Sequence, residues 1–393
     1  MTAVQSGFHN FSRQEMLIYG RPAAEVVVEL AQRDRKSRAF IVTNRSLGDS
    51  ALVRGHVEVL GERFAGLFDG CAAHSPRESV LRGSAAARAA GADVLIAIGG
   101  GSVIDAAKVM LGCLWCGIET TEQLDALRDG LYAEGLSGPQ PLRLVAVPTT
   151  LSAAEFTPLA GITDIGRGAK DLFLHPLYVP STVVLDPQAT MLTPDWLFSS
   201  TGVRSIDHCV ETLLSSQPSP FADALARDGL RLLSRSLSAF RRTPADAASR
   251  LDCQLGTWLA ISGPVSGVPL GASHAIGRVL GGAFDVPHGH TSCVLLPAVL
   301  KWNAQAGAEA VARQQQVSAA MDAPPGSSAA DAVALLVRAL GQPGSLRDLG
   351  IGREKFAVLA EKSMVMLRHP TTAGNQRALR SEQDVLEILE LAY

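Results

Sequence analysis

The sequence predicts an α/β domain that is followed by an all-helical domain. Over the first half of the chain, short and almost wholly apolar segments alternate with segments whose apolar residues have helical spacing. Buried strands separated by helices are typical of a parallel sheet that is covered on both faces. From about residue 190 onward no convincing strand pattern appears, and only helical patterns follow. We therefore place a first domain at 1–189 and a second at 190–393, with the boundary near 187–193.

The individual elements follow from apolar runs and their flanking turn residues. The predicted strands are 39–44, 93–101, 142–150 and 181–187, and the helices between them are 22–33, 77–90 and 104–116. In the second half, clusters of proline, glycine and serine separate the helical patterns. These patterns are 194–215, 222–240, 244–262, 289–306, 308–321, 329–340, 353–366 and 382–391.

The composition excludes several classes of function. The 393 residues include 35 Lys and Arg against 38 Asp and Glu, a net charge of −3, without a long run of like charge. We therefore expect neither nucleic acid nor a membrane as a partner. Hydrophobic residues make up 47% and charged residues only 19%, which favours a large core and further burial in a homodimer. With no signal-peptide pattern and six scattered cysteines, we expect a cytoplasmic protein with free thiols.

A glycine-rich turn gives the strongest local signal. Gly99, Gly100 and Gly101 stand between an apolar strand and a helix that begins at Ser102. Glycines let backbone N–H groups approach a phosphate, and a helix N-terminus adds partial positive charge. Asp105 could cap or orient this loop. The G-x-G-x-x-G fingerprint is absent, so the alternative is a tight turn that binds no pyrophosphate.

A second loop follows the strand at 142–150. Thr149 and Thr150 stand at its carboxyl end, where open α/β sheets bind their ligands, and Ser152 comes shortly after them. The hydroxyl groups could donate to a cofactor, and a simple capping turn is the alternative.

Histidines and arginines form a third pattern, in the helical half. Arg204 and His208 are four residues apart and share one helix face, and His274 and Arg278 repeat this spacing. His288 and His290 begin a further element. One histidine among apolar residues is usually a core residue, but histidines on several helices are a candidate site.

These motifs together resemble the iron-containing (group III) alcohol dehydrogenases. The resemblance rests on the glycine turn with Asp105 and Lys108, Pro148-Thr-Thr, Asp186-Pro187, His208, and the interval from His274 to His288. It runs over nearly the whole chain. It implies a Rossmann-like domain and an all-helical domain, as in dehydroquinate synthase, with the active site in the cleft between them. It also implies hydride transfer between a nicotinamide cofactor and a carbonyl or alcohol.

The resemblance has one departure that concerns metal. Metal-using members hold a divalent ion with one Asp and three His, and His208, His274 and His288 match the histidines. Arg204 stands where the Asp belongs, so a charge of −1 becomes +1. Asp207 points about 100° away from His208 on a helix, and Glu211 is a possible substitute ligand. We therefore expect no metal, with the three histidines as fallback ligands.

The sequence is most similar to the maleylacetate reductases, a branch that works without metal. The spacing of 148–158 and the pattern of 280–288 carry this similarity. It implies NAD(P)H-dependent reduction of a keto or enol carboxylic acid of aromatic catabolism. Where that branch usually has Asn and His, this chain has Arg204 and Arg278.

The two arginines suggest how such a substrate is held. Guanidinium groups bind carboxylates, often through two hydrogen bonds. His208, His274 or His288 could then act as an imidazolium that stabilises the developing alkoxide. The alternative is that the arginines pair with Asp207, Glu211 or Asp285 and do not touch the substrate.

Cofactor preference depends on the end of the strand at 39–44. Where NAD-specific relatives have Asp, this chain has Asn44 beside Arg45, so we expect NADPH to be tolerated. The residues that we assign to the cofactor are Asn44, Gly99, Gly100, Gly101, Ser102, Asp105, Thr149, Thr150 and Ser152.

Three other functions compete with a metal-free reductase. One is a metal-dependent alcohol dehydrogenase of the same family with an altered ligand set. Another is a lyase or cyclase related to dehydroquinate synthase, which would need a lysine cluster that 200–290 lacks. The third is a non-catalytic homologue, which would bind no cofactor.

Overall fold

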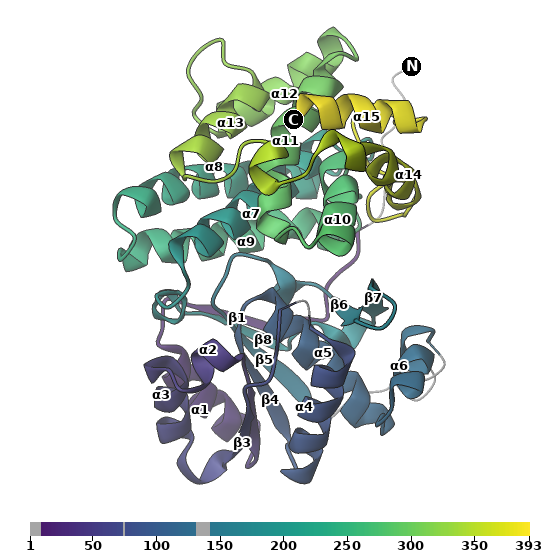
Figure 1. Ribbon diagram of the computed structural model, residues 1–393. Coiled ribbons are helices and arrows are strands. Elements are labelled where there is room, and N and C mark those ends of the chain that lie inside the picture. The colour runs from purple at the N-terminus through teal and green to yellow at the C-terminus, as the bar shows by residue number, and fades with distance from the viewer. Residues whose placement is uncertain (1–8, 74, 131–141) are drawn as a thin grey trace. The chain divides into compact units, whose positions relative to one another are not determined.

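A computed structural model describes residues 9–73, 75–130 and 142–393 (Figure 1). The chain divides into two compact units. One unit comprises residues 12–193, and the other comprises 194–393 together with the described residues before 12. Asn10 belongs to the second unit, where its N–H donates to the carbonyl of Ser266 at 3.0 Å.

A six-stranded sheet, parallel throughout, forms the centre of the first unit. Its order is β1 (Met16–Tyr19), β8 (Thr182–Leu185), β5 (Arg143–Pro148), β4 (Val94–Gly99), β2 (Ala39–Val42) and β3 (Phe64–Phe68). The four predicted strands are β2, β4, β5 and β8, and the structure confirms them. The edge strands β1 and β3 escaped prediction because they are only half-buried and lack a long apolar run.

Helices cover both faces of this sheet, as the buried apolar strands predict. Ile41, Ile96 and Val145 face one core, and Phe40 and Leu95 face the other. The helices of the first core are α1 (Ala23–Arg33) and α3 (Ala51–Leu60), and those of the second are α4 (Arg77–Ala89) and α5 (Gly101–Cys116). Alternate residues of one strand therefore point into different cores.

Helix α3 was not among the predicted helices, and two further parts of this unit were not predicted either. An antiparallel hairpin consists of β6 (Leu159–Asp164) and β7 (Ala169–Leu174), and α6 (Thr121–Arg128) lies beside it. The buried Arg77 joins them, because its Nη2 lies 2.6 Å from Asp125 and 2.5 Å from Asp171. In the part of the chain that is described, no single helix could cross a membrane, and only the bent pair of α5 and α6 has the length and composition.

The second unit is helical, as predicted (Figure 1). Its helices are α7 (Asp195–Leu214), α8 (Pro220–Arg242), α9 (Ala247–Ser266), α10 (Ala272–Phe284), α11 (His288–Ala304), α12 (Ala308–Ala320), α13 (Ala329–Ala339), α14 (Phe356–Leu367) and α15 (Glu382–Leu391). Only α10 was missing from the predicted helical segments. Three glycines interrupt its sequence, and glycine is a poor helix former. Helix α7 is buried along most of its length and contacts both α10 and α11.

Candidate active site

The strand order of the first unit creates a point where ligands of α/β sheets bind. The chain passes from β2 to β3 on one side, whereas β4 lies on the other side of β2, and β5 follows beyond it. The strand order therefore reverses between β2 and β4. Crevices at such reversals, at the carboxyl ends of the strands, hold the ligand. Asn44 follows β2 and the glycine turn follows β4, so both predicted cofactor elements flank this point.

The glycine turn has the geometry of an anion site. Helix α5 begins at Gly101, one residue earlier than predicted, and Gly100 precedes it without a side-chain cap. The first N–H groups of the helix therefore have no intrahelical partner. A Cβ at Gly100 would lie 2.9 Å from Cγ2 of Thr150, and one at Gly101 would lie 2.9 Å from Oγ of Ser152. Glycine is thus needed for close packing as well as for any bound phosphate.

The threonine loop lies directly against this turn. The N–H of Thr149 donates to the carbonyl of Gly99 at 3.0 Å, which continues the pairing of β5 with β4. The Oγ1 atom of Thr150 is buried and has no hydrogen-bond partner among the described residues. A buried hydroxyl without a partner is costly unless a ligand or water satisfies it. This atom therefore supports a ligand site beside the glycine turn.

Asp105 contacts the hairpin and Lys108, and its role at the glycine turn is still a prediction. Its carboxylate accepts the N–H of Gly161 at 3.0 Å and lies 3.6 Å from Nζ of Lys108. Lys108 is completely buried and donates to the carbonyls of Ala154 at 2.6 Å and Leu159 at 2.8 Å. Asp105 and Lys108 therefore join α5 to the loop that follows β5 and to the hairpin of β6 and β7.

Asn44 has a structural role, and its role toward the cofactor is still a prediction. Its Oδ1 accepts the N–H of Leu47 at 3.1 Å and the hydroxyl of Ser46 at 2.8 Å, and so caps the short helix α2 (Arg45–Gly48). The residue remains neutral at the end of β2, so no carboxylate opposes a phosphate there.

In the second unit, three helices bring the predicted histidines together. His208 on α7 and His274 on α10 are buried, and their rings stack with centroids 4.7 Å apart. His288 begins α11 and is close enough to influence the pKa of His274. Gly281 makes room for it, since a Cβ there would lie 2.7 Å from Cε1 of His288. His290 lies apart from this group and packs against the ring of Trp196.

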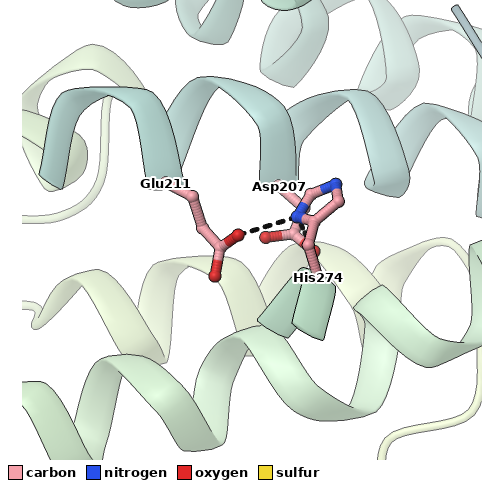
Figure 2. A group of neighbouring side chains, drawn as sticks. All are labelled: Asp207, Glu211 and His274. Carbon is pink, nitrogen blue, oxygen red and sulfur yellow. Dashed lines mark hydrogen bonds and ion pairs between the residues drawn. The ribbon is translucent and has the colours of Figure 1, made fainter. Parts of the chain in front are cut away.

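Two buried carboxylates beside His274 complete the group (Figure 2). Oε2 of Glu211 lies 2.7 Å from Nδ1 of His274, and Oδ2 of Asp207 lies 3.5 Å from the same atom. Asp207 also accepts the hydroxyls of Ser273 and Ser292, both at 2.7 Å. Burial raises the pKa of both carboxyl groups. The charge of Glu211 raises the pKa of Asp207 further, whereas the backbone N–H groups of Gly271 and Ser273 oppose the rise at Glu211.

Neither arginine forms the ion pair that was considered as an alternative. Nη1 of Arg204 donates to Ser292 at 3.2 Å, and Nη1 of Arg278 donates to Thr371 at 3.0 Å. Within the described residues, no carboxylate oxygen lies within ion-pair distance of either guanidinium. Burial and the charge of Arg204 lower the pKa of Arg278 to about 10, so it is still a cation at neutral pH. Both arginines therefore retain most of their N–H groups for a ligand.

His208 and His274 are neutral, which argues against an imidazolium at these two rings and leaves His288 as a prediction. Burial lowers the pKa of His208 well below its ordinary value, and His274 and the two arginines lower it further. Burial and the same arginines also lower the pKa of His274. Both rings are therefore neutral at pH 7, because a buried positive charge beside two guanidiniums is unfavourable.

The residues present do not suit a resident divalent cation. Ligand atoms of Asp207, Glu211 and His274 do lie within 4.8 Å of one another. However, both oxygens of Glu211 accept backbone N–H groups, and Asp207 already accepts two hydroxyls. Glu211 therefore turns toward the start of α10 and is not a substitute ligand for the histidines. The charge of Arg204 acts on His208 and His274 and would also repel a dication.

The residues predicted from the sequence did not include the hydroxyl groups of this site. Ser273 could have been inferred, because it stands next to His274. Ser292 and Thr371 come from other segments, and only the packing of the helices brings them to the arginines.

A reversal of strand order in a parallel α/β sheet, with buried histidines beside half-buried arginines in a helical unit, fits an oxidoreductase. Comparison with known proteins identifies the family. The chain belongs to the iron-containing alcohol dehydrogenase family: the model described as "Iron-containing alcohol dehydrogenase" matches residues 15–187, and "Fe-containing alcohol dehydrogenase family, C-terminal" matches 198–393.

Several relatives are named maleylacetate reductase. The protein of Burkholderia cepacia is 29% identical over 97% of this chain and 96% of its own length. Maleylacetate reductase 2 of Cupriavidus pinatubonensis is 33% identical over 81% of this chain and 80% of its own. The crystal structure of maleylacetate reductase from Agrobacterium tumefaciens has a TM-score of 0.80 and 25% identity, covering 99% of each chain. The Rossmann-like unit followed by a helical unit is thus the fold of this family.

Proposed function

We propose that this protein is an NAD(P)H-dependent reductase of a keto or enol carboxylic acid, and that it works without metal. The observation that carries the proposal is the pair Arg204 and Arg278, which have no carboxylate partner among the described residues and act electrostatically on His208 and His274. The relatives named maleylacetate reductase support the substrate class. Such an acid belongs to the breakdown of aromatic compounds.

The first unit supplies the cofactor site. The N-terminal N–H groups of α5 hold the pyrophosphate, and the hydroxyl of Thr150 donates to the cofactor beside it. Asn44 leaves the ribose 2′ position without an opposing negative charge, so NADH and NADPH are both accepted. When bound, the cofactor supplies the hydride.

The second unit supplies substrate binding and electrostatic stabilisation. A guanidinium with free N–H groups binds a carboxylate through two parallel hydrogen bonds. Arg204 and Arg278 hold the substrate carboxylate in this way. Their fixed charges also favour the negative oxygen that develops at the carbonyl, and they need no rearrangement to do so. This replaces the role of a metal as an electrophile.

A substrate screen tests the proposal. The purified protein is supplied with keto and enol carboxylic acids, and the oxidation of NADH and of NADPH is followed with and without a chelator. We expect reduction of acids that persists in chelator, and much weaker reduction of the corresponding methyl esters. Equal activity on acids and esters, or activity that disappears with chelator, would contradict the proposal.

A metal-dependent alcohol dehydrogenase is the second candidate. The observation in its favour is the close group of Asp207, Glu211 and His274. Elemental analysis of the purified protein separates the two functions, because this candidate requires one divalent ion per chain. The cytoplasmic location and the homodimer are still predictions, and size-exclusion chromatography with light scattering checks the second.

A further inference from the structure

We propose that Thr371 is a positioning residue that holds the guanidinium of Arg278 where it can bind a substrate carboxylate. The hydrogen bond between the two residues then strengthens the preference for acids over uncharged carbonyl compounds. This inference rests on the proposed function, in which Arg278 binds that carboxylate. Thr371 acts through the arginine and takes no part in the chemical step.

The guanidinium of Arg278 has one hydrogen-bond partner among the described residues, and this partner is Thr371. Nη1 of Arg278 donates to Oγ1 of Thr371 at 3.0 Å. Arg278 is half-buried, and burial and the charge of Arg204 lower its pKa. Like charges repel, so without an anchor Arg278 would turn away from Arg204 and toward the solvent. Thr371 therefore opposes this repulsion and restricts the rotamers of a long side chain.

The hydroxyl of Thr371 is itself oriented by His369. The backbone N–H of Thr371 donates to Nδ1 of His369 at 3.3 Å, so this nitrogen is an acceptor. Burial and the charge of Arg278 lower the pKa of His369, so its ring is neutral at pH 7. The hydroxyl of Thr371 lies 2.9 Å from Nδ1 and therefore donates its hydrogen to the ring. The lone pairs of Oγ1 are then available to the N–H of Arg278.

The segment that carries Thr371 is fixed to the chain just before α10, the helix of Arg278. The carbonyl of Thr371 accepts the N–H of Leu270 at 2.9 Å. The next residue, Thr372, is completely buried, and its hydroxyl donates to the carbonyl of Met366 at 2.6 Å. These bonds hold the backbone of Thr371 in place, so its hydroxyl presents a fixed acceptor to the arginine.

Arg204 is held in the same way, by a hydroxyl that has a second partner. Ser292 accepts Nη1 of Arg204 at 3.2 Å and donates its own hydrogen to Asp207 at 2.7 Å. In both cases the hydroxyl gives its hydrogen to another acceptor and turns a lone pair to the guanidinium. A guanidinium that is fixed before the substrate arrives loses less conformational entropy on binding.

Kinetics of two variants test the inference, with an acid that the wild-type protein reduces and with its methyl ester. Thr371→Val removes the hydroxyl, and Thr371→Ser keeps it. Because Thr371 is exposed, we expect Thr371→Val to raise KM for the acid about tenfold, the lower end for a hydrogen bond to a charged group. The kcat for the acid and both constants for the ester should stay nearly unchanged, and Thr371→Ser should resemble the wild type. Equal losses for acid and ester, or a normal KM in Thr371→Val, would overturn the inference.

A double-mutant cycle shows whether Thr371 acts through Arg278. Arg278→Ala should raise KM for the acid, and Thr371→Val should add nothing to that increase. A further rise of about tenfold in the double variant, as large as that of a lost hydrogen bond, would give Thr371 a contact of its own with the substrate. That result would contradict a positioning role.

Thr372→Val is the matched control, because it removes the neighbouring hydroxyl of the same segment. It should lower the free energy of unfolding, since the carbonyl of Met366 loses its donor. The ratio of kcat/KM between acid and ester should not change. A change in this ratio as large as that in Thr371→Val would show that the packing of the segment, and not the hydroxyl on Arg278, determines the preference.

Nuclear magnetic resonance distinguishes failure of this inference from failure of the proposed function, because it needs no substrate. In protein with ¹⁵N-labelled arginine, an anchored guanidinium gives separate signals for its two Nη groups, and a freely rotating one gives an averaged signal. Arg278→Lys identifies the signals. We expect separate signals in the wild-type protein and an averaged signal in Thr371→Val. Averaged signals in both would overturn the inference even if acids are reduced. The expected difference without reduction of any acid would reject the proposed function and leave the anchoring of Arg278 standing.

Discussion

Arg204 offers the sharpest test of substrate binding. It stands on α7 four residues before His208 and uses one N–H to reach Ser292 at 3.2 Å. A guanidinium has five N–H groups, so most of them are available to a substrate carboxylate. We expect Arg204→Ala to weaken the reaction of acids selectively, because the substrate carboxylate then lies in a buried site without its partner.

The size of the effect follows from how far the pair is buried. Removing one partner of a buried charge pair costs about 2–5 kcal/mol. Arg204 is only half-buried, so the lower part of this range applies. A loss of about 2–3 kcal/mol corresponds to a decrease of about 30- to 160-fold in kcat/KM.

Steady-state kinetics with an acid and its methyl ester measure this loss. We expect kcat/KM for the acid to fall by the stated factor and that for the ester to change by less than about threefold, within the usual range of surface effects. Arg235→Ala is the control, because Arg235 is an exposed arginine of the same unit, paired with Asp322 at 2.7 Å. Equal losses for acid and ester in Arg204→Ala would contradict the binding of a substrate carboxylate by Arg204, because the arginine would then serve only the packing of α7.

Four other predictions concern the metal, the cofactor and the pH dependence of stability. The purified protein should contain little iron or zinc, and Arg204→Asp should gain affinity for a divalent ion, both measured by elemental analysis. Asn44→Asp should lower kcat/KM for NADPH far more than for NADH, and an unchanged ratio would remove this residue from the cofactor site. Gly100→Ala should weaken cofactor binding in titration calorimetry. Because the added Cβ also meets Cγ2 of Thr150, the double variant with Thr150→Ser relieves that contact, and recovered binding there would argue against a phosphate at the glycine. Burial raises the pKa of Glu155 from 4.5 to about 7. A raised carboxyl pKa contributes stability below pH 4.5 that is lost as the pH rises to about 7. Glu155→Gln should therefore flatten the decline of the unfolding free energy over this range, as measured by urea denaturation, and an unchanged slope would contradict the assignment.

Apolar runs predicted the central strands because these strands are buried on both faces. Ile96 and Leu95 serve opposite cores, so the whole of β4 is apolar and conspicuous. Strand β3 has one exposed edge and the sequence FAGLF, which carries no such signal. Helix α10 was obscured by its glycines, although Gly277 and Gly281 allow Thr291 and His288 of α11 to come close to it.

The candidate site was predictable where spacing along one helix determines it. Arg204 and His208 were expected on one face of a helix; Arg204 lowers the pKa of His274, and the ring of His208 stacks on that of His274. A charged ring was considered for His208 and His274, and their lowered pKa could not be predicted, because burial and neighbouring charge arise only when the helices pack. The contact between Glu211 and His274 joins residues 63 positions apart. No local pattern in the sequence reveals it.

Because the strand order reverses between β2 and β4, the proposed cofactor site has two separate parts. One part concerns the preference for NADH or NADPH, and the other concerns the binding of the pyrophosphate. Asn44 follows β2, and the glycine turn follows β4, so each belongs to its own strand-and-helix segment with its own core contacts. A change at Asn44 need not disturb the packing of Gly100 against Thr150. Under the proposed function, the preference for NADH or NADPH can therefore change, by evolution or by design, while the pyrophosphate site keeps its structure.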